Sequence, residues 1–175
     1  LYNPILKIIT KMFIDHESKE SIEFNNKFNL IPGINNMNFD QKKAIFDSIT
    51  SKDYSIISGC KNSGKSTILA SLIHSFKNEG KTVLVICPSK ESLQNIRLLL
   101  GDEIDLIRIY CTYHQVILNE QGFLSVLLIT QEYIASAEAT KEYFDILILD
   151  DCEKIKFSYI ITAFRICKKY IICGD

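Results

Sequence analysis

The sequence lacks the features that mark several large classes of protein. Among its 175 residues, 20 are Lys or Arg and 21 are Asp or Glu, so no overall charge draws the chain toward nucleic acid or an anionic membrane. No apolar run approaches the roughly 20 residues that span a bilayer, and no signal-peptide layout is present. We therefore expect an intracellular protein, cytoplasmic or nuclear, with no membrane partner.

Disulfide and zinc-binding patterns are also missing. The six cysteines form no C-x-x-C pair, and no histidine lies at zinc-ligand spacing from them. Most of them lie in or beside apolar runs, where a free cysteine behaves as a small buried hydrophobe. We expect reduced structural thiols, with Cys60 as the exception because it falls in an exposed loop.

What the sequence does contain is an alternation of apolar runs and helical patterns, at a length that suits one domain. Residues 1–37 are read as an N-terminal helical or linker segment. Helices are expected at 38–49 (with Asn38 or Asp40 as N-cap), 65–80, 90–101 and about 158–167, and strands at 54–58, 82–88, 104–110, 125–130, 144–150 and 169–175. Continuous apolar strands alternating with helices indicate a mainly parallel sheet covered on both faces.

Residues 58–69, SGCKNSGKSTIL, fit the phosphate-loop pattern G-x-x-x-x-G-K-[ST]. An apolar run precedes the loop and a helical pattern follows it, which is the context that the motif needs. Glycines let the backbone wrap around an anion, and the helix N-terminus adds partial positive charge. Lys65 is predicted to pair with the β- and γ-phosphates, and Ser66 to coordinate Mg²⁺. The predicted nucleotide-contacting residues of the loop are Gly59, Cys60, Lys61, Asn62, Ser63, Gly64, Lys65, Ser66 and Thr67.

Residues 144–153, FDILILDDCE, supply the acidic partner that a phosphate loop requires. An apolar strand runs into two adjacent carboxylates. Asp150 is predicted to hold the Mg²⁺ shell, and Asp151 to orient or deprotonate the attacking water. With Lys65, these are the candidate catalytic residues.

Several other phosphate-loop enzymes remain as alternatives, and each lacks a motif here. The L-S-G-G-Q stretch of transporter ATPases and the N-K-x-D guanine reader of GTPases are absent. The arginine-rich lid of small-molecule kinases is not available, because the three arginines (Arg97, Arg108 and Arg165) are widely scattered. A further alternative is a nucleotide-binding clamp that does not hydrolyse.

Six stretches occur in the order of a known family: MNFDQKKAI, SGCKNSGKST, VLVICPSKESLQNI, LLITQEYIAS, DILILDDCEK and YIICGD. Together they resemble the first RecA-like domain of superfamily 1 helicases, in the branch of the nonsense-mediated-decay helicase and senataxin. The resemblance covers about residues 37–175. It implies a three-layer α/β RecA-like P-loop NTPase domain over 38–175 that uses ATP and Mg²⁺. It also implies single-stranded RNA or DNA as a partner, and a second RecA-like domain outside this excerpt.

The resemblance carries further residue roles. Gln41 would contact adenine, since its amide offers one donor and one acceptor to the N6/N7 edge. Pro88, Ser89 and Lys90 would begin a segment that grips a nucleic-acid backbone, and Thr130 would lie in a second strand-contacting element. Asp175 would begin the element that senses the γ-phosphate.

The acidic motif departs from the family pattern Asp-Glu-Ala-x, because the chain has Asp151 and Cys152 at the second and third positions. Aspartate is one methylene shorter than glutamate, which would leave the carboxylate about 1–1.5 Å farther from the water. Misplacement of this size costs on the order of a hundredfold in rate. The sequence therefore predicts weak hydrolysis.

Overall fold

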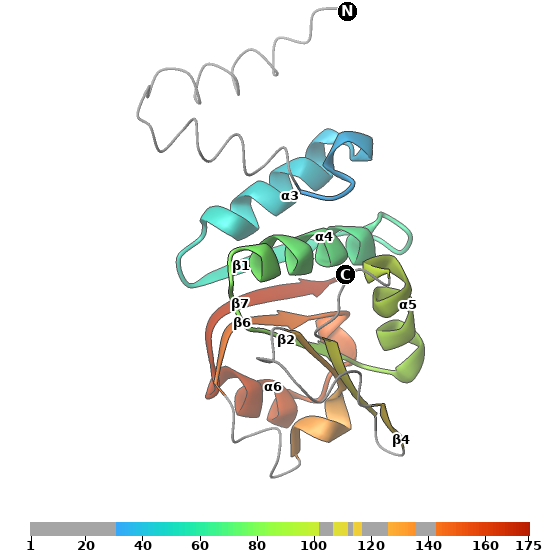
Figure 1. The fold of residues 1–175 in the computed structure, drawn as a ribbon, viewed down its shortest axis with the longest axis vertical. Coiled ribbons are helices and arrows are strands. Elements are labelled where there is room, and N and C mark those ends of the chain that lie inside the picture. The colour runs from blue at the N-terminus through green and yellow to red at the C-terminus, as the bar shows by residue number, and fades with distance from the viewer. Residues whose placement is uncertain (1–30, 102–106, 112–113, 117–125, 136–142) are drawn as a thin grey trace, which may run out of the picture.

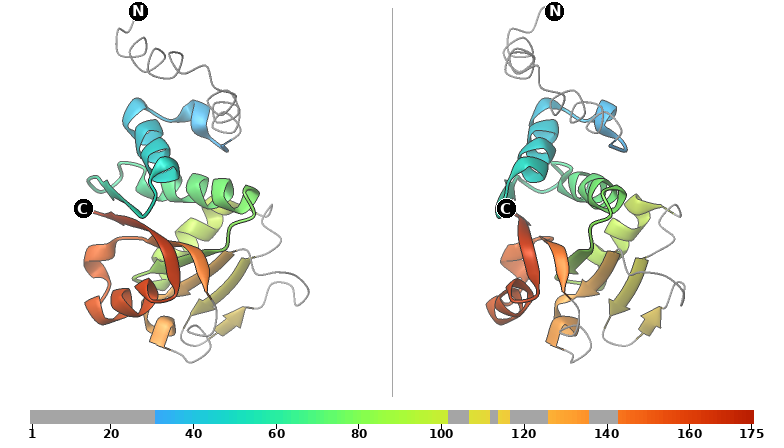
Figure 2. Two further views of the ribbon diagram at one scale, coloured as in Figure 1. Left: turned by 90° about the vertical axis from the view of Figure 1, so that its left-hand side faces the viewer. Right: turned by 60° about the vertical axis from the view of Figure 1, so that its left-hand side comes forward.

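The computed structural model describes residues 31–101, 107–111, 114–116, 126–135 and 143–175. Figure 1 shows a central sheet with α3, α4 and α5 on one side and α6 on the other, and the views in Figure 2 agree. The fold is therefore the three-layer α/β arrangement expected from the sequence. Within the described residues, no helix is long and apolar enough to cross a membrane.

The sheet has seven strands in the order β1-β7-β6-β2-β5-β3-β4. Their bounds are β1 Tyr54–Ser58, β2 Val83–Cys87, β3 Ile107–Cys111, β4 His114–Val116, β5 Val126–Thr130, β6 Phe144–Leu149 and β7 Cys167–Gly174. Neighbouring strands are parallel, except that β4 pairs antiparallel with β3 at one edge. The prediction of a mainly parallel sheet is confirmed.

Two of the four described α-helices, α3 and α5, begin at residues whose side chains cap them. The bounds of the four helices are α3 Phe39–Thr50, α4 Lys65–Asn78, α5 Lys90–Leu100 and α6 Phe157–Phe164. Asn38 caps α3 in a capping box, accepting from the Gln41 amide N–H at 2.9 Å while Gln41 Oε1 accepts from the Asn38 N–H at 3.0 Å. Ser89 caps α5 by accepting from the Ser92 N–H at 3.2 Å. Three short 3-10 helices complete the described elements: η1 Ile34–Asn36, η2 Gln131–Ala135 and η4 Cys152–Lys154.

Two apolar clusters form the core, one on each face of the sheet. The first packs alternate strand residues against α4 and α5, and includes Ile45 of α3. The second packs the opposite strand faces against η2 and α6. All five residues of β2 are buried, because this strand lies in the middle of the sheet with helices on both sides.

The C-terminal helix is shorter than expected, and the last strand is longer. The helix predicted to reach about residue 167 ends at Phe164, and β7 begins at Cys167 rather than 169. The Tyr170 hydroxyl donates to the carbonyls of Phe164 and Cys167, and its ring lies 4.5 Å from that of Phe164. Phe144 pairs with Cys167 in the β6–β7 ladder, so tertiary pairing overrides the helical pattern there.

Residues just before α3 pack onto the domain. Ile31, Ile34 and Met37 are buried in the first apolar cluster, and the Ser71 hydroxyl of α4 donates to the Pro32 carbonyl at 2.8 Å. The division of the chain into residues 1–37 and 38–175 stays a prediction, and residues 1–30 lie outside the described part.

Candidate nucleotide-binding site

The predicted site residues gather at the carboxyl edge of the parallel sheet. The phosphate loop follows β1, Asp175 follows β7, and Asp150 follows β6. Because β1, β7 and β6 are neighbours, these three loops meet. The Gly59 N–H donates to the Gly174 carbonyl at 3.2 Å, and the Asp150 N–H donates to the Ile86 carbonyl at 3.0 Å. Ligands of open α/β sheets bind outside this edge.

The phosphate loop turns sharply into α4. Asn62 and Gly64 have φ values of 65° and 88°, in the left-handed region. Gly64 is the N-cap of α4 and has no side chain with which to cap it, so the first N–H groups of the helix keep their donor capacity. These donors and the helix dipole together suit an anion.

Gln41 braces this loop from the side of α3. Its Nε2 donates to the Ser63 carbonyl at 2.9 Å, while its Oε1 completes the α3 capping box. A Cβ on Gly64 would overlap the Gln41 amide. The described contacts of Gln41 are thus to the protein, and its predicted adenine contact stays a prediction.

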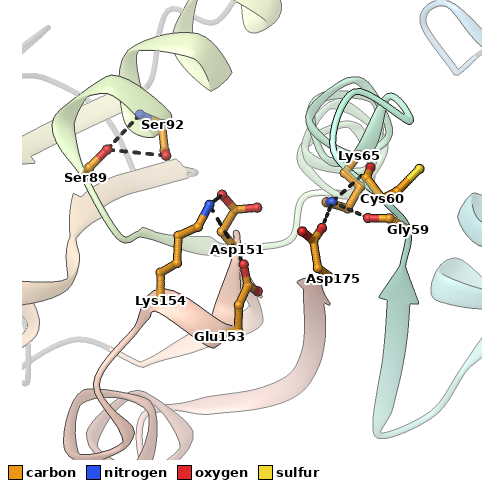
Figure 3. A network of polar contacts seen from close by, with 9 residues as sticks. All are labelled: Gly59, Cys60, Lys65, Ser89, Ser92, Asp151, Glu153, Lys154 and Asp175. Carbon is orange, nitrogen blue, oxygen red and sulfur yellow. Dashed lines mark hydrogen bonds and ion pairs between the residues drawn. The ribbon is translucent and has the colours of Figure 1, made fainter.

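The Lys65 ammonium lies inside the loop that it follows (Figure 3). It contacts the Gly59 carbonyl, donates to the Cys60 carbonyl at 3.3 Å, and forms an ion pair with Asp175. The hydrogen bond that Lys65 donates to Asp175 is the main cause that raises the pKa of Lys65, and the same bond lowers the pKa of Asp175. Lys65, the predicted phosphate-binding cation, is therefore joined to the end of β7 in this structure.

Asp150 lies deeper, with 4% of its surface exposed. Burial raises the pKa of its carboxyl to about 6, and the neighbouring Asp151 adds to the rise. Lys154 and Lys65 act in the opposite direction but do not offset the burial. Among the described residues, no lysine or arginine forms an ion pair with Asp150, and a buried carboxylate of this kind is stabilised by a divalent metal.

The residues 150–154, called the acidic turn below, carry three carboxylates. Asp151 has φ 47° and ψ 56° and caps η4. Its Oδ2 lies 2.5 Å from the Lys154 Nζ, which is also 3.9 Å from the Glu153 Oε1 (Figure 3). The acidic turn packs on the end of β7, since a Cβ on Gly174 would come within 2.6 Å of Glu153 Oε2 and 2.9 Å of Cys152 Sγ. Asp151, the predicted water-activating group, is thus held by a lysine.

The residues present fit a Mg²⁺ ion. The Asp150 carboxylate and Ser66 hydroxyl are hard oxygen donors of the kind that Mg²⁺ prefers, and both lie where strand ends meet the phosphate loop. These two residues would hold the metal, which would supply charge neutralisation. Lys65 would hold phosphate oxygens, and the N–H groups of α4 would orient them.

The predicted nucleic-acid residues lie farther along the same edge. Pro88 and Ser89 are partly buried at the start of α5, and Lys90 is exposed. Thr130 ends β5 with 1% of its surface exposed, and its Oγ1 has no hydrogen-bond partner. A contact from the Thr130 hydroxyl to a nucleic-acid strand would require the end of β5 to open. The nucleic-acid roles of these residues stay predictions.

Gln131 is a structural link that the sequence did not reveal. Its Nε2 donates to the Pro88 carbonyl at 3.1 Å, and its Oε1 accepts from the Lys156 N–H at 2.9 Å. The buried amide thus joins the loop before α5 to the loop before α6. No sequence signal identifies it, because both partners are backbone groups of distant segments. The Asp151–Lys154 contact has a weak sequence signal, because the two residues are three positions apart in an acidic segment.

The cysteines behave largely as expected from the sequence. Cys60 is exposed, whereas Cys87, Cys167 and Cys173 are buried. Burial raises the pKa of Cys87 and raises that of Cys173 to about 12, so both thiols beside Asp150 stay protonated. No group of His, Cys, Asp and Glu residues among those described is arranged to hold a metal by itself. Cys111 has no described side chain.

One known protein resembles this chain in sequence. No family model matches the chain. The chain is 24% identical over 160 residues to the DNA replication ATP-dependent helicase/nuclease DNA2 of Saccharomyces cerevisiae, an alignment that covers 79% of this chain and 10% of that protein.

Solved structures share the architecture at lower sequence identity. The UvsW helicase of bacteriophage T4 aligns with TM-score 0.61 and 16% identity over 79% of this chain and 52% of that chain. The SWI2/SNF2 ATPase core of Sulfolobus solfataricus, solved in complex with dsDNA, aligns with TM-score 0.57 and 15% identity over 77% of this chain and 31% of that chain. This chain spans about half or less of each protein.

These likenesses establish that the chain has the RecA-like fold of helicase ATPase cores, as the sequence motifs predicted.

Proposed function

We propose that this chain is the ATP- and Mg²⁺-binding part of a helicase-type motor, in which nucleotide hydrolysis drives movement on RNA or DNA. The observation that carries the proposal is the convergence of three loops on one point. Lys65 of the phosphate loop contacts Asp175 of β7, and the buried Asp150 of β6 follows the adjacent strand. A phosphate-loop lysine and a strand-end carboxylate are the groups that hold a phosphate and its metal in enzymes of this kind.

The comparisons support a helicase of superfamily 1 or 2, and the narrower superfamily 1 assignment rests on the motif order in the sequence. DNA2 and UvsW are named as helicases, and the SWI2/SNF2 core was solved with dsDNA. For this chain we propose single-stranded nucleic acid as the partner, approaching along Pro88–Lys90. In motors of this type ATP lies between two RecA-like domains, so we propose that a second such domain completes the site.

The coupling between nucleotide and nucleic acid tests this proposal. Affinity for a non-hydrolysable ATP analogue is measured by calorimetry with and without a single-stranded oligonucleotide, at fixed salt because phosphate contacts are salt-dependent. The motor proposal predicts that each ligand changes the affinity for the other by the same factor. An affinity for the ATP analogue that neither an RNA nor a DNA oligonucleotide changes would contradict the motor proposal.

A hydrolysis-deficient clamp is the second candidate, and the Asp151–Lys154 contact favours it. Asp151 is both shorter than the glutamate of the family pattern and engaged with an ammonium at 2.5 Å. For a motor with a weakened water-activating group, Asp151→Glu should raise nucleic-acid-stimulated ATP turnover in the full-length protein, by up to about a hundredfold. An unchanged rate would favour the clamp.

A further inference from the structure

Lys154 ends the acidic turn, and the proposed function gives it no role. Its Nζ lies 2.5 Å from Asp151 Oδ2 and 3.9 Å from Glu153 Oε1, although 59% of its side chain is exposed (Figure 3). Asp151 is the main cause that raises the pKa of Lys154, with smaller contributions from Glu153 and Asp175. The ammonium thus faces carboxylates on two sides of the site.

The geometry of the contact is built into the backbone. Asp151 precedes the 3-10 helix Cys152–Lys154, and residues three apart in such a helix lie above one another. The turn is anchored by the buried Ile155 and by the contact of Glu153 with the end of β7. The Lys154 stem is long and exposed, so its ammonium is free to swing outward while the acidic turn stays in place.

The carboxyl groups around the acidic turn explain why an ammonium stabilises the turn when no metal is bound. Asp150, Asp151, Glu153 and Asp175 bring four carboxyl groups to neighbouring strand ends. Lys65 lies on the phosphate-loop side and pairs with Asp175, which leaves Lys154 as the cation on the acidic-turn side among the described residues. Lys154 also favours the ionised form of the buried Asp150.

We propose that Lys154 is a tethered cation that competes with Mg²⁺ at the acidic turn, so that its ammonium must leave Asp151 when Mg²⁺ and nucleotide load. The inference rests on the proposed function, since it concerns the same metal site. A divalent ion held by Asp150 repels the ammonium that pairs with the adjacent Asp151, and each cation weakens the binding of the other. Lys154 thereby sets the Mg²⁺ concentration at which the site fills.

The test measures the Mg²⁺ concentration at half-maximal binding of a fluorescent non-hydrolysable ATP analogue, by anisotropy at constant ionic strength. Lys154→Met should lower this midpoint by about three- to tenfold, the effect of removing one unit charge near a divalent ion in a water-like medium. Lys154→Arg keeps the charge and should keep the wild-type midpoint. In EDTA, Lys154→Met should bind the analogue no more tightly than wild type, which separates metal competition from a general gain in affinity.

Lys168→Met is the matched control. Lys168 is exposed and pairs with Asp145 at 2.9 Å where β7 and β6 begin, at the opposite end of these strands from the acidic turn, so its loss should leave the midpoint unchanged. An unchanged midpoint in Lys154→Met, or an equal shift in both lysine variants, would overturn the inference. The proposed function would stand in that case, because the protein would still bind the nucleotide analogue. If the wild-type protein bound no analogue at any Mg²⁺ concentration, the proposed function would fall, and this inference with it.

Discussion

Burial of the Asp150 carboxyl lowers the stability of the folded protein at neutral pH, and the same carboxyl is the proposed metal ligand. Its pKa in the folded protein is about 6, above the ordinary 3.8, because burial disfavours the charged form. Below pH 3.8 the group is protonated in the folded and unfolded states alike. As pH rises from 3.8 to about 6 the unfolded chain ionises first, so the contribution of Asp150 to stability is lost across that window.

Asp150→Asn should therefore stabilise the metal-free protein at pH 8 by about 1–3 kcal/mol and have no such effect at pH 3.5. Urea unfolding at both pH values measures the difference. Asp47→Asn, which removes an exposed carboxylate of α3, is the control and should be near neutral at either pH. A gain of equal size at pH 3.5 and pH 8 would argue against burial of a charge as the cause.

Gly64 combines two demands that no other residue type meets. Its φ of 88° lies in the left-handed region, and a Cβ would overlap the Gln41 amide that braces the loop. Gly64→Ala should abolish detectable nucleotide-analogue binding while the protein remains folded. Gly80→Ala is the control, since Gly80 also has a positive φ of 71° but has nothing within 4 Å of an added Cβ. Loss of binding in both variants would point to general strain rather than to the loop.

Between elements, Asp145 ties the start of β6 to the start of β2. Its Oδ2 accepts from the Thr82 N–H at 3.1 Å and from the Thr82 hydroxyl at 3.0 Å, and its Oδ1 accepts from Lys168 at 2.9 Å. The Lys168 hydrogen bond, followed by those of Thr82, lowers the pKa of Asp145 to about 2. The stability it supplies is present above pH 3.8 and is lost as pH falls through about 2.

Asp145→Ala should destabilise the protein by about 1–3 kcal/mol at pH 7, because it leaves the partly buried Thr82 donors without their acceptor. Chemical unfolding measures this loss. Lys168→Met removes the exposed ion pair alone and should cost less than about 1 kcal/mol. If the two variants were equally destabilised, the ion pair rather than the Thr82 contacts would be the source of the stability.

The sequence predicted the elements well where one physical signal dominated. β2 and the stretch Ile146–Leu149 of β6 are continuous apolar runs that are fully buried, and Asn38 is a recognisable cap for α3. The start of β7 was missed because its first residues continue the preceding helical pattern, and their strand conformation depends on pairing with β6. Strand β4 was missed because a three-residue edge strand leaves no periodic signal.

The site likewise contains some residues whose positions the sequence predicts and others whose contacts it does not predict. The phosphate loop and the acidic motif lie at strand ends, so the parallel topology alone brings Lys65 and Asp150 to one edge. The partners of these groups depend on how the loops fold back, and no sequence signal predicts that Gln131 joins Pro88 to Lys156. Nor did the sequence analysis predict that Asp151 would be paired with Lys154.

At the scale of the whole molecule, the ends of β1, β7 and β6 meet at the edge of the sheet where we propose that nucleotide binds, and ligands of open α/β sheets bind at such an edge. Its net charge of −1 offers no general attraction for a polyanion, so nucleotide binding must come from local groups. Lys65 and the loop around it are therefore the features on which the proposed nucleotide binding depends most.

Isothermal titration calorimetry of a non-hydrolysable ATP analogue, with Mg²⁺ in excess, tests this claim most directly. The account predicts one nucleotide per chain for the wild-type protein, and loss of that binding in Lys65→Ala at unchanged folding by circular dichroism. Equal affinity in the wild-type and Lys65→Ala proteins, or no binding by either, would contradict it.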